Sequence, residues 1–176
     1  MKNITDSVVV YLSKLLKQLF LMLIMLTIYI PAYAAVATAT ATANITSTIT
    51  VSTINGLFFG DISSGAVAGT LILSPGGIRT TTGGVTVNTA VAGSPATFDV
   101  QGTPNATYSI SLPAAVVMTD GTSTMVIDNF TSSPVTTGVI GASGQQTLFV
   151  GGTLNVSSNQ PFGSYTGSLS VTVDYN

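Results

Sequence analysis

The stretch Ala106-Thr107-Tyr108-Ser109-Ile110-Ser111-Leu112 alternates apolar and polar side chains without interruption. Successive side chains of an extended chain point to opposite faces, so Tyr108, Ile110 and Leu112 share one face and the hydroxyl side chains share the other. This period of two indicates a β-strand that is buried on one side. The earlier stretch Ala96-Thr97-Phe98-Asp99-Val100 follows the same pattern. Together they predict an all-β fold.

Turn signals separate the alternating stretches, for example Ser74-Pro75-Gly76-Gly77, Gly93-Ser94-Pro95 and Asn159-Gln160-Pro161. Proline presets φ and glycine tolerates a positive φ, so such clusters favour tight turns. Helix-forming residues at a spacing of 3.6 are missing between them. The rhythm predicts a β-sandwich, and Gly151-Gly152 is interpreted as a bulge that interrupts the strand at 145–156. The strands are expected near 47–54, 57–62, 69–74, 84–88, 95–101, 106–112, 114–119, 123–130, 145–156 and 164–175.

The first 34 residues have a different composition from the rest of the chain. Lys2, Lys14 and Lys17 precede or interrupt apolar sequence, and the run from Leu19 to Ile30 is apolar except for Thr27. A basic segment followed by an apolar core is typical of a secretory signal peptide. An uncleaved membrane anchor is the alternative, since the stretch from Val8 to Ile30 is mostly apolar and about 20 such residues span a bilayer.

The residues after the apolar run favour cleavage. Ala32 and Ala34 are small residues at the −3 and −1 positions of a cleavage site that would leave Ala35 as the new N-terminus. Removing residues 1–34 from a chain of 176 leaves 142, the usual size of one domain. We therefore expect an exported chain with an N-terminal arm at residues 35–44 and one domain at residues 45–176.

Charge narrows the possible partners. After residue 34 the chain keeps Arg79 as its only base beside five aspartates, which gives a formal charge of −4. A chain with one base has no electrostatic footprint for a phosphate backbone or for an anionic membrane surface. Nucleic acid is therefore excluded as a partner, and no membrane insertion is expected after cleavage. Arg79 itself is interpreted as a turn residue that keeps its loop soluble.

Side chains that could carry out catalysis or bind a metal are equally scarce. The chain after residue 34 has no His, Cys, Glu, Lys or Trp, which are the residues that most often carry acid–base and nucleophilic catalysis. Oxygen ligands occur in Asp120-Gly121-Thr122-Ser123 and Asp128-Asn129, but the spacing of a calcium-binding loop is missing. We expect neither an enzyme nor a cofactor or metal, and we assign these aspartates to turns and strand ends.

Alternating segments occupy both ends of the predicted mature chain. At about 3.3 Å per residue, residues 35–44 extend over about 33 Å. The apolar face of this arm comprises Ala35, Ala37, Ala39, Ala41, Ala43 and Ile45. The same face continues through Ile49 and Val51, so a longer arm that includes these two residues is an alternative.

The C-terminal segment alternates for eleven residues, from Tyr165 to Tyr175, and Asn176 follows. One face comprises Tyr165, Gly167, Leu169, Val171, Val173 and Tyr175. We expect no later strand to cover this segment. An unpaired edge of this length is a template for the addition of a strand from another chain.

Four segments together resemble a bacterial family of exported β-sandwich domains of unassigned function. They are Leu73 to Arg79, Pro95 to Phe98, Gly102 to Tyr108 and Gly163 to Tyr175. That family is similar to the spore-coat-U-like pilins of archaic chaperone–usher systems. The resemblance covers essentially the whole chain after residue 34. It implies an immunoglobulin-like, pilin-type β-sandwich that lacks its last strand and polymerises by donor-strand exchange.

The resemblance also implies roles for residues and partners. Residues 35–44 would be the donor strand, and Tyr165, Leu169, Val171, Val173 and Tyr175 would line the acceptor groove. A periplasmic chaperone would fill the groove first and hold the carboxylate of Asn176. An outer-membrane usher and other copies of the pilin would be the remaining partners. The implied location is the periplasm in transit and a fimbria on the cell surface afterwards.

A second interpretation remains open. A secreted monomeric β-sandwich would bind carbohydrate or a surface partner through loop aromatics such as Phe162. This interpretation predicts that the N-terminal arm folds back on its own sheet. An outer-membrane barrel fits less well, because few Phe and Tyr residues are present to form interfacial girdles.

Overall fold

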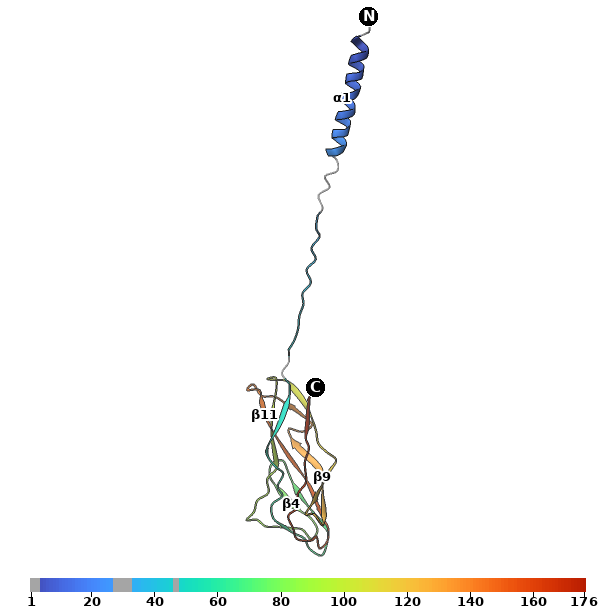
Figure 1. Cartoon of the computed structure of the whole chain (residues 1–176). Helices are drawn as coiled ribbons and strands as arrows, with labels where there is room; N and C mark the ends of the chain where they lie inside the picture. Colours follow the sequence, from blue (N-terminus) through green and yellow to red (C-terminus); the bar gives the residue numbers. More distant parts are fainter. Residues whose placement is uncertain (1–3, 27–32, 46–47) are drawn as a thin grey trace. The chain divides into compact units, whose positions relative to one another are not determined.

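The structure is a computed structural model that describes residues 4–26, 33–45 and 48–176. They divide into two units, Met1–Ala43 and Asn44–Asn176. The first unit contains helix α1, Ile4–Leu26 (Figure 1). By length and composition, its segment Ser7–Met25 can cross a membrane, with a mean hydropathy of 1.8. An apolar N-terminal helix of this kind fits the predicted signal sequence.

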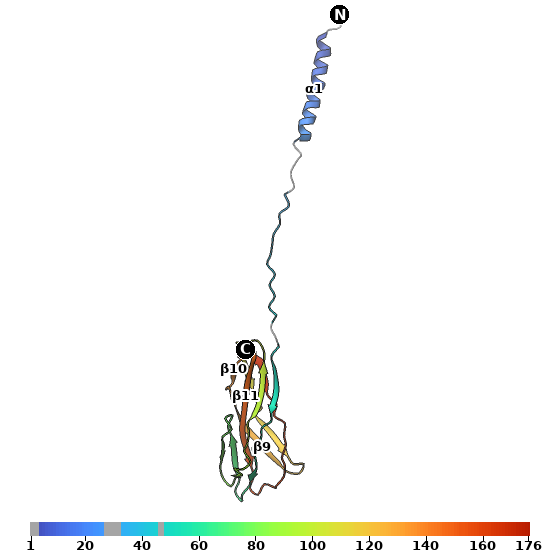
Figure 2. The ribbon, with the colours of Figure 1, turned by 90° about the vertical axis from the view of Figure 1, so that its left-hand side faces the viewer.

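The second unit consists of β-strands and the turns between them (Figures 1 and 2). In chain order the strands are β1 (Thr50–Asn55), β2 (Ile62–Ser63), β3 (Gly69–Leu73), β4 (Arg79–Thr81), β5 (Thr86–Val87), β6 (Ala96–Gln101), β7 (Thr107–Ser111), β8 (Ala115–Thr119), β9 (Thr124–Ser133), β10 (Thr137–Val139), β11 (Gln145–Val156) and β12 (Thr172–Tyr175). All pairings between them are antiparallel. The all-β, sandwich-like fold predicted from the alternation is therefore confirmed.

The long strand β11 organises the largest sheet. It pairs with β6 along its first half and with β3 along its second half, while β9 pairs across the middle. Because these pairings overlap, β6 and β3 share one edge of β11 and β9 occupies the other. β1 continues the sheet beyond β6, β4 continues it beyond β3, and β8 continues it beyond β9.

Along β11, pairing with β6 ends at Val150 and pairing with β3 begins at Gly152, and Gly151 lies between them. The register with β9 shifts between Gly151 and Thr153, which is a β-bulge. A Cβ atom on Gly151 would collide with the carbonyl oxygen of Leu73, so only glycine fits this close approach. The predicted interruption at Gly151-Gly152 is thus a bulge, and the strand continues through it.

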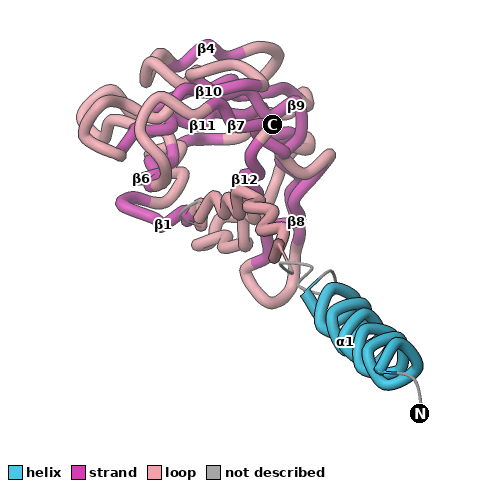
Figure 3. The backbone as a smooth tube through the Cα atoms, turned by 90° about the horizontal axis from the view of Figure 1, so that it is seen from above, coloured by secondary structure: helices cyan, strands magenta, loops and turns pink. Residues whose placement is uncertain are grey.

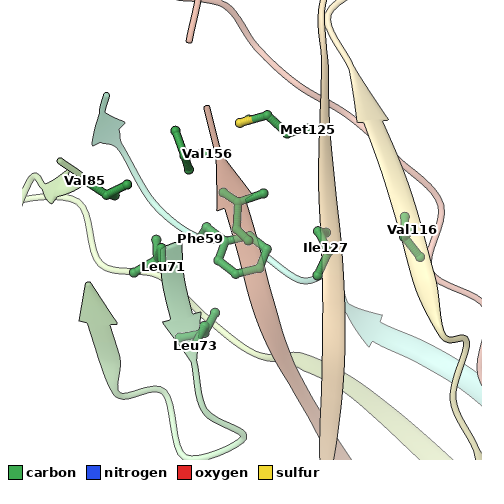
Figure 4. Packing of buried hydrophobic residues seen from close by; sticks show 9 residues of the cluster. Phe59, Leu71, Leu73, Val85, Val116, Met125, Ile127 and Val156 are labelled. Atoms are coloured by element: carbon green, nitrogen blue, oxygen red, sulfur yellow. The ribbon is translucent and has the colours of Figure 1, made fainter. Parts of the chain in front are cut away.

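A second sheet has the order β10-β7-β12, and a small third sheet pairs β2 with β5. Two clusters of buried side chains fill the interior. In the first, shown in Figure 4, Phe59 lies between Leu71 and Ile127. The second is formed by Ala96, Phe98, Val100, Tyr108, Ile140, Leu148, Val150 and Val173. Half-buried Leu57, Phe130 and Leu169 pack against both clusters.

Most predicted strands are present, and the differences have local causes. The stretch predicted at 57–62 contributes one isolated bridge, Phe58 to Ser94, and the first residue of β2, Ile62, because Gly60 turns the chain between them with φ of 80°. The strand predicted at 47–54 begins at Thr50, and residues 46 and 47 lie outside the described residues. The strand predicted at 84–88 shrinks to Thr86–Val87. The short strands β4 and β10 were missed because neither shows apolar alternation.

Candidate functional site

The described residues contain no group of three or more His, Cys, Asp or Glu side chains that would hold a metal ion. Asp120 lies in the turn between β8 and β9, whereas Asp128 is opposite Ala115 at the far end of this hairpin. The structure therefore does not bring the two aspartates together. Asp128 accepts a hydrogen bond from Nδ2 of Asn129 at 3.0 Å.

Asp120 organises its turn. Its Oδ1 accepts the backbone N–H groups of Ser123 at 2.6 Å and Thr122 at 2.8 Å. Backbone hydrogen bonds from Ser123 and Thr122 lower the pKa of this carboxyl, because they stabilise its charged form. The role is structural, as expected for an aspartate in a tight turn.

The feature that stands out is the edge strand β1. Its residues Val51 and Thr53 pair with Val100 and Phe98 of β6, and directly paired residues point to the same face of a sheet. Val100 and Phe98 are buried, with 0% and 5% of their surfaces exposed. On the same face, Val51 is only half-buried and Thr53 is exposed. The core-facing side of β1 is therefore only partly covered.

The C-terminal segment forms a second open edge. Tyr165, Leu169, Val171 and Tyr175 are half-buried and Val173 is buried, while the alternate residues are exposed. The predicted facing of these side chains therefore agrees with the structure, with Gly167 as the exposed exception. The predicted eleven-residue strand does not agree with the structure. Only Thr172–Tyr175 pairs with β7, and Thr166 makes one bridge to Thr119 of β8.

β1 and β12 are neighbours on the same side of the domain (Figure 3). Each pairs on one side only, β1 with β6 and β12 with β7. In residues 48–176 no backbone hydrogen bond joins β1 to residues 165–175. We call the space between these two edges the open seam. Apolar side chains from both edges border it, and they belong to the second core cluster: Ile49, Val51, Leu169, Val171 and Tyr175.

Tyr175 fastens one end of the open seam. Its hydroxyl accepts the N–H of Thr103 at 2.6 Å and donates to Oγ1 of the same residue at 3.3 Å. The neighbouring Asn176 donates its backbone N–H to Thr107 O at 3.2 Å. The C-terminal strand is thereby tied to the turn after β6 and to β7. Since Tyr175 lies near the start of β1 and Tyr165 near its end, the two edges run antiparallel.

Residues 33–45, which include the predicted arm, form neither helix nor strand, and all their side chains are exposed. Ala34 and Ala35 belong to this segment, whereas Ala32 lies outside the described residues. The longer version of the arm is wrong: Val51 pairs within the domain's own sheet and Ile49 packs on its core. These two residues belong to the open seam and not to the arm.

Arg79 has a more specific role than a soluble turn residue. Its guanidinium donates from Nη1 to the carbonyl oxygen of Phe59 and from Nη2 to that of Asn88, both at 3.2 Å. The side chain thus holds two loops against β4. A single arginine among turn residues gave no signal of this role, because its partners are backbone atoms about 10 to 20 residues away in sequence.

A cavity of about 620 Å³ lies at the end of the open seam where Tyr165 and Leu57 meet. Its apolar lining comprises Leu57, Phe59, Met118, Met125, Leu154 and Val156. Phe58 and Phe162 stand at its mouth, with 49% and 102% of their surfaces exposed. Among these residues, sequence reasoning singled out only Phe162 and Tyr165.

Comparison with known proteins gives one match. A family model described as a domain of unknown function (DUF4402) matches residues 49–175. No curated protein and no solved structure matches the chain. The matched range contains all strands from β1 to β12, and therefore both edges of the open seam.

Proposed function

The chain belongs to the DUF4402 family of domains of unknown function, and from this premise we propose that it is a structural subunit of a bacterial surface filament. Residues 35–44 of one subunit add as a strand to the open seam of the next. This is the donor-strand exchange implied by the resemblance to spore-coat-U-like pilins. A periplasmic chaperone occupies the open seam during transit, and an outer-membrane usher assembles the filament.

The exposure of β1 carries this proposal. Val51 and Thr53 share a face with buried Val100 and Phe98, yet Val51 is only half-buried and Thr53 is exposed. A complete sandwich buries such positions between its two sheets. A strand laid along β1 and the C-terminal segment would cover them and pair with both free edges.

The arm suits this role by its exposure and its side chains. Its alternate alanines form a narrow apolar face with hydroxyl side chains opposite. Alanine buries little surface, since each CH₂ group contributes about 0.8 kcal/mol. Main-chain hydrogen bonds at about 0.5–1.5 kcal/mol each must therefore supply much of the affinity. This favours a long paired segment over a few deep pockets.

The distance between β1 and β12 determines whether a third strand can enter the open seam. β1 and β12 have Cα atoms within 8 Å of each other. Two strands that flank a third lie about 9.5 Å apart, twice the usual spacing of about 4.8 Å. The open seam therefore has to widen where β12 approaches β1 before a strand enters. A chaperone that holds the two edges apart would supply this widening.

The signal sequence fits the same scheme. Cleavage before Ala35 frees the arm from the apolar helix that precedes it. An uncleaved arm would stay attached to a segment able to cross a membrane. We therefore propose export through the periplasm, with the mature subunit at the cell surface.

The test places charge on one face of the arm at a time. Ala39→Asp with Ala41→Asp changes the face that enters the open seam, whereas Thr40→Asp with Thr42→Asp adds the same charge to the opposite face. Burying an unpaired carboxylate is costly. We expect the alanine pair to reduce filaments by about tenfold or more, and the threonine pair to change them less than about twofold.

Electron microscopy of surface material and immunoblots of periplasmic subunit provide the measurement. Accumulation of folded, unassembled subunit in the alanine variant supports donor-strand exchange. Equal filament yields from both variants, or filaments after deletion of residues 35–44, contradict it.

One observation favours the second candidate, a monomeric surface binder. Phe162 is fully exposed at the mouth of the cavity, and exposed aromatics serve as stacking surfaces for ligands. In that case the secreted protein stays monomeric, and Phe162→Ala abolishes binding to cell-surface glycans on an array. Residues appended after Asn176 then leave its secretion unchanged, whereas they block chaperone capture of a filament subunit.

A further inference from the structure

The cavity at the Tyr165 end of the open seam has the size of a ligand site. Its volume of about 620 Å³ falls within the range of about 300–1,000 Å³ of small-molecule pockets. We propose that it binds a neutral, largely apolar small molecule. The proposal does not depend on filament assembly.

The polar groups around the cavity already satisfy one another. Tyr165 donates its hydroxyl hydrogen to Pro161 O at 2.8 Å and accepts from Nε2 of Gln160 at 3.0 Å. The same Nε2 donates to Thr124 O at 3.2 Å, and Ser64 Oγ donates to Gln160 O at 3.0 Å. No buried side-chain nitrogen or oxygen atom in the described residues lacks a partner.

The lack of unpaired buried polar groups determines which kind of molecule can bind in the cavity. A sugar or another polyol entering the cavity would lose hydrogen bonds to water and find few free groups to replace them, which is unfavourable. An apolar guest has no hydrogen bonds to water that it would lose on binding. The free polar side chains among the lining residues, Asp61, Ser63 and Ser164, are exposed, so they remain hydrated when the floor is covered.

Charge disfavours an ionised guest. Asp61 stands on the lining and repels anions. Arg79 reaches the same wall, but its guanidinium donates to the carbonyl oxygens of Phe59 and Asn88. A cation could pair with Asp61 only at the exposed rim, and on the apolar floor it would be desolvated, which is costly. A neutral molecule meets neither obstacle.

The lining is also adaptable. Met118 and Met125 lie on its floor, and methionine side chains adjust to guests of different shape. Phe58 and Phe162 at the mouth expose large apolar surfaces that a bound guest would partly cover. Aromatic side chains dominate the energetics of such contacts.

A fluorescence titration tests the proposal with N-phenyl-1-naphthylamine, a neutral apolar probe whose emission rises in apolar surroundings. The protein is the full chain as recovered from exporting cells. We expect saturable binding of one probe per subunit. The combined change Phe58→Ala and Phe162→Ala should weaken binding about tenfold, whereas Ile78→Ala with Val135→Ala, at residues 70% and 72% exposed elsewhere, should leave it unchanged.

A matched pair on β8 sharpens the result. Met118 lines the cavity, while its neighbour Val117 points to the opposite face and is 59% exposed. Met118→Lys should abolish probe binding and Val117→Lys should preserve it, with folding of both checked by circular dichroism. Because the open seam is also apolar, Val171→Ser serves as a further control that should retain binding. Equal binding by all variants, or loss in Val171→Ser alone, overturns the proposal.

Discussion

At the scale of single residues, a few side chains fasten segments that alternation alone does not hold. Tyr175 joins the last strand to the turn after β6 through Thr103, and Arg79 joins two loops to β4 through backbone carbonyls. Asp120 closes the hairpin of β8 and β9. The contacts of all three are with turn residues or with residues distant in the sequence, which explains why period-two patterning revealed none of them.

Replacing Tyr175 by Phe should loosen the last strand. The change removes the acceptor of the Thr103 N–H and leaves this partly buried donor without that bond. We expect a loss of about 1–2 kcal/mol in the free energy of unfolding, measured by urea denaturation. Ser109→Ala is the control, because its hydroxyl donates to Asp174 O at an exposed site and its loss should cost less than about 0.5 kcal/mol. Equal losses would contradict the role of Tyr175.

The carboxyl of Asp120 should make stability depend on pH in the acid range. Its pKa is lowered in the folded state by the backbone hydrogen bonds of Ser123 and Thr122. The stability that it contributes is thus fully present above the ordinary value of 3.8 and is lost as the pH falls through the lower folded pKa. Asp120→Asn should therefore lose less stability than the native protein on acidification below that value.

Denaturant unfolding measured at several acid pH values checks this expectation. Asp174→Asn is the control, since this residue shares no turn with Ser123 and Thr122. A native protein and an Asp120→Asn variant with the same acid dependence would contradict the assignment.

At the scale of elements, alternation predicted where side chains point better than which strands pair. In residues 165–175 the facing of the large apolar side chains was correct, but only Thr172–Tyr175 forms a strand. Facing follows from the local geometry of an extended chain. Pairing depends on a neighbouring edge, and none pairs with residues 167–171 within the domain. Period-two patterning therefore cannot distinguish a strand that is paired within the domain from an extended segment that has no partner strand there.

Hydrogen exchange should distinguish the open edges from the centre of the sheet. In unassembled subunit, amides of residues 167–171 should exchange fast and those of β11 slowly, because β11 is paired on both sides along much of its length. On assembly, residues 167–171 and the outward amides of β1 should slow by about tenfold or more. β4, an edge remote in the sheet order, is the internal control. Unchanged exchange at the open seam would contradict strand addition.

At the scale of the whole molecule, composition and patterning differ in how far the structure tests them. The structural or binding role expected from the scarcity of bases and of catalytic side chains stays a prediction. The sandwich itself followed from alternation and turn signals. The open seam did not, since it arises from edges that are far apart in sequence, β1 and the C-terminal segment. The cavity was likewise not predicted, because β2, β8, β9, β11 and two loops contribute to its lining.

The single basic residue after residue 34 has a consequence for resistance to proteases. Trypsin-like proteases cut only after lysine or arginine, and Arg79 is the one such residue beyond residue 34. The bond that follows it lies within β4, and its side chain is held by the carbonyls of Phe59 and Asn88. A protease cleft needs an extended, unpaired segment with a free side chain. If the proposed filaments form, they should therefore resist a trypsin-like protease that digests lysine-rich proteins under the same conditions.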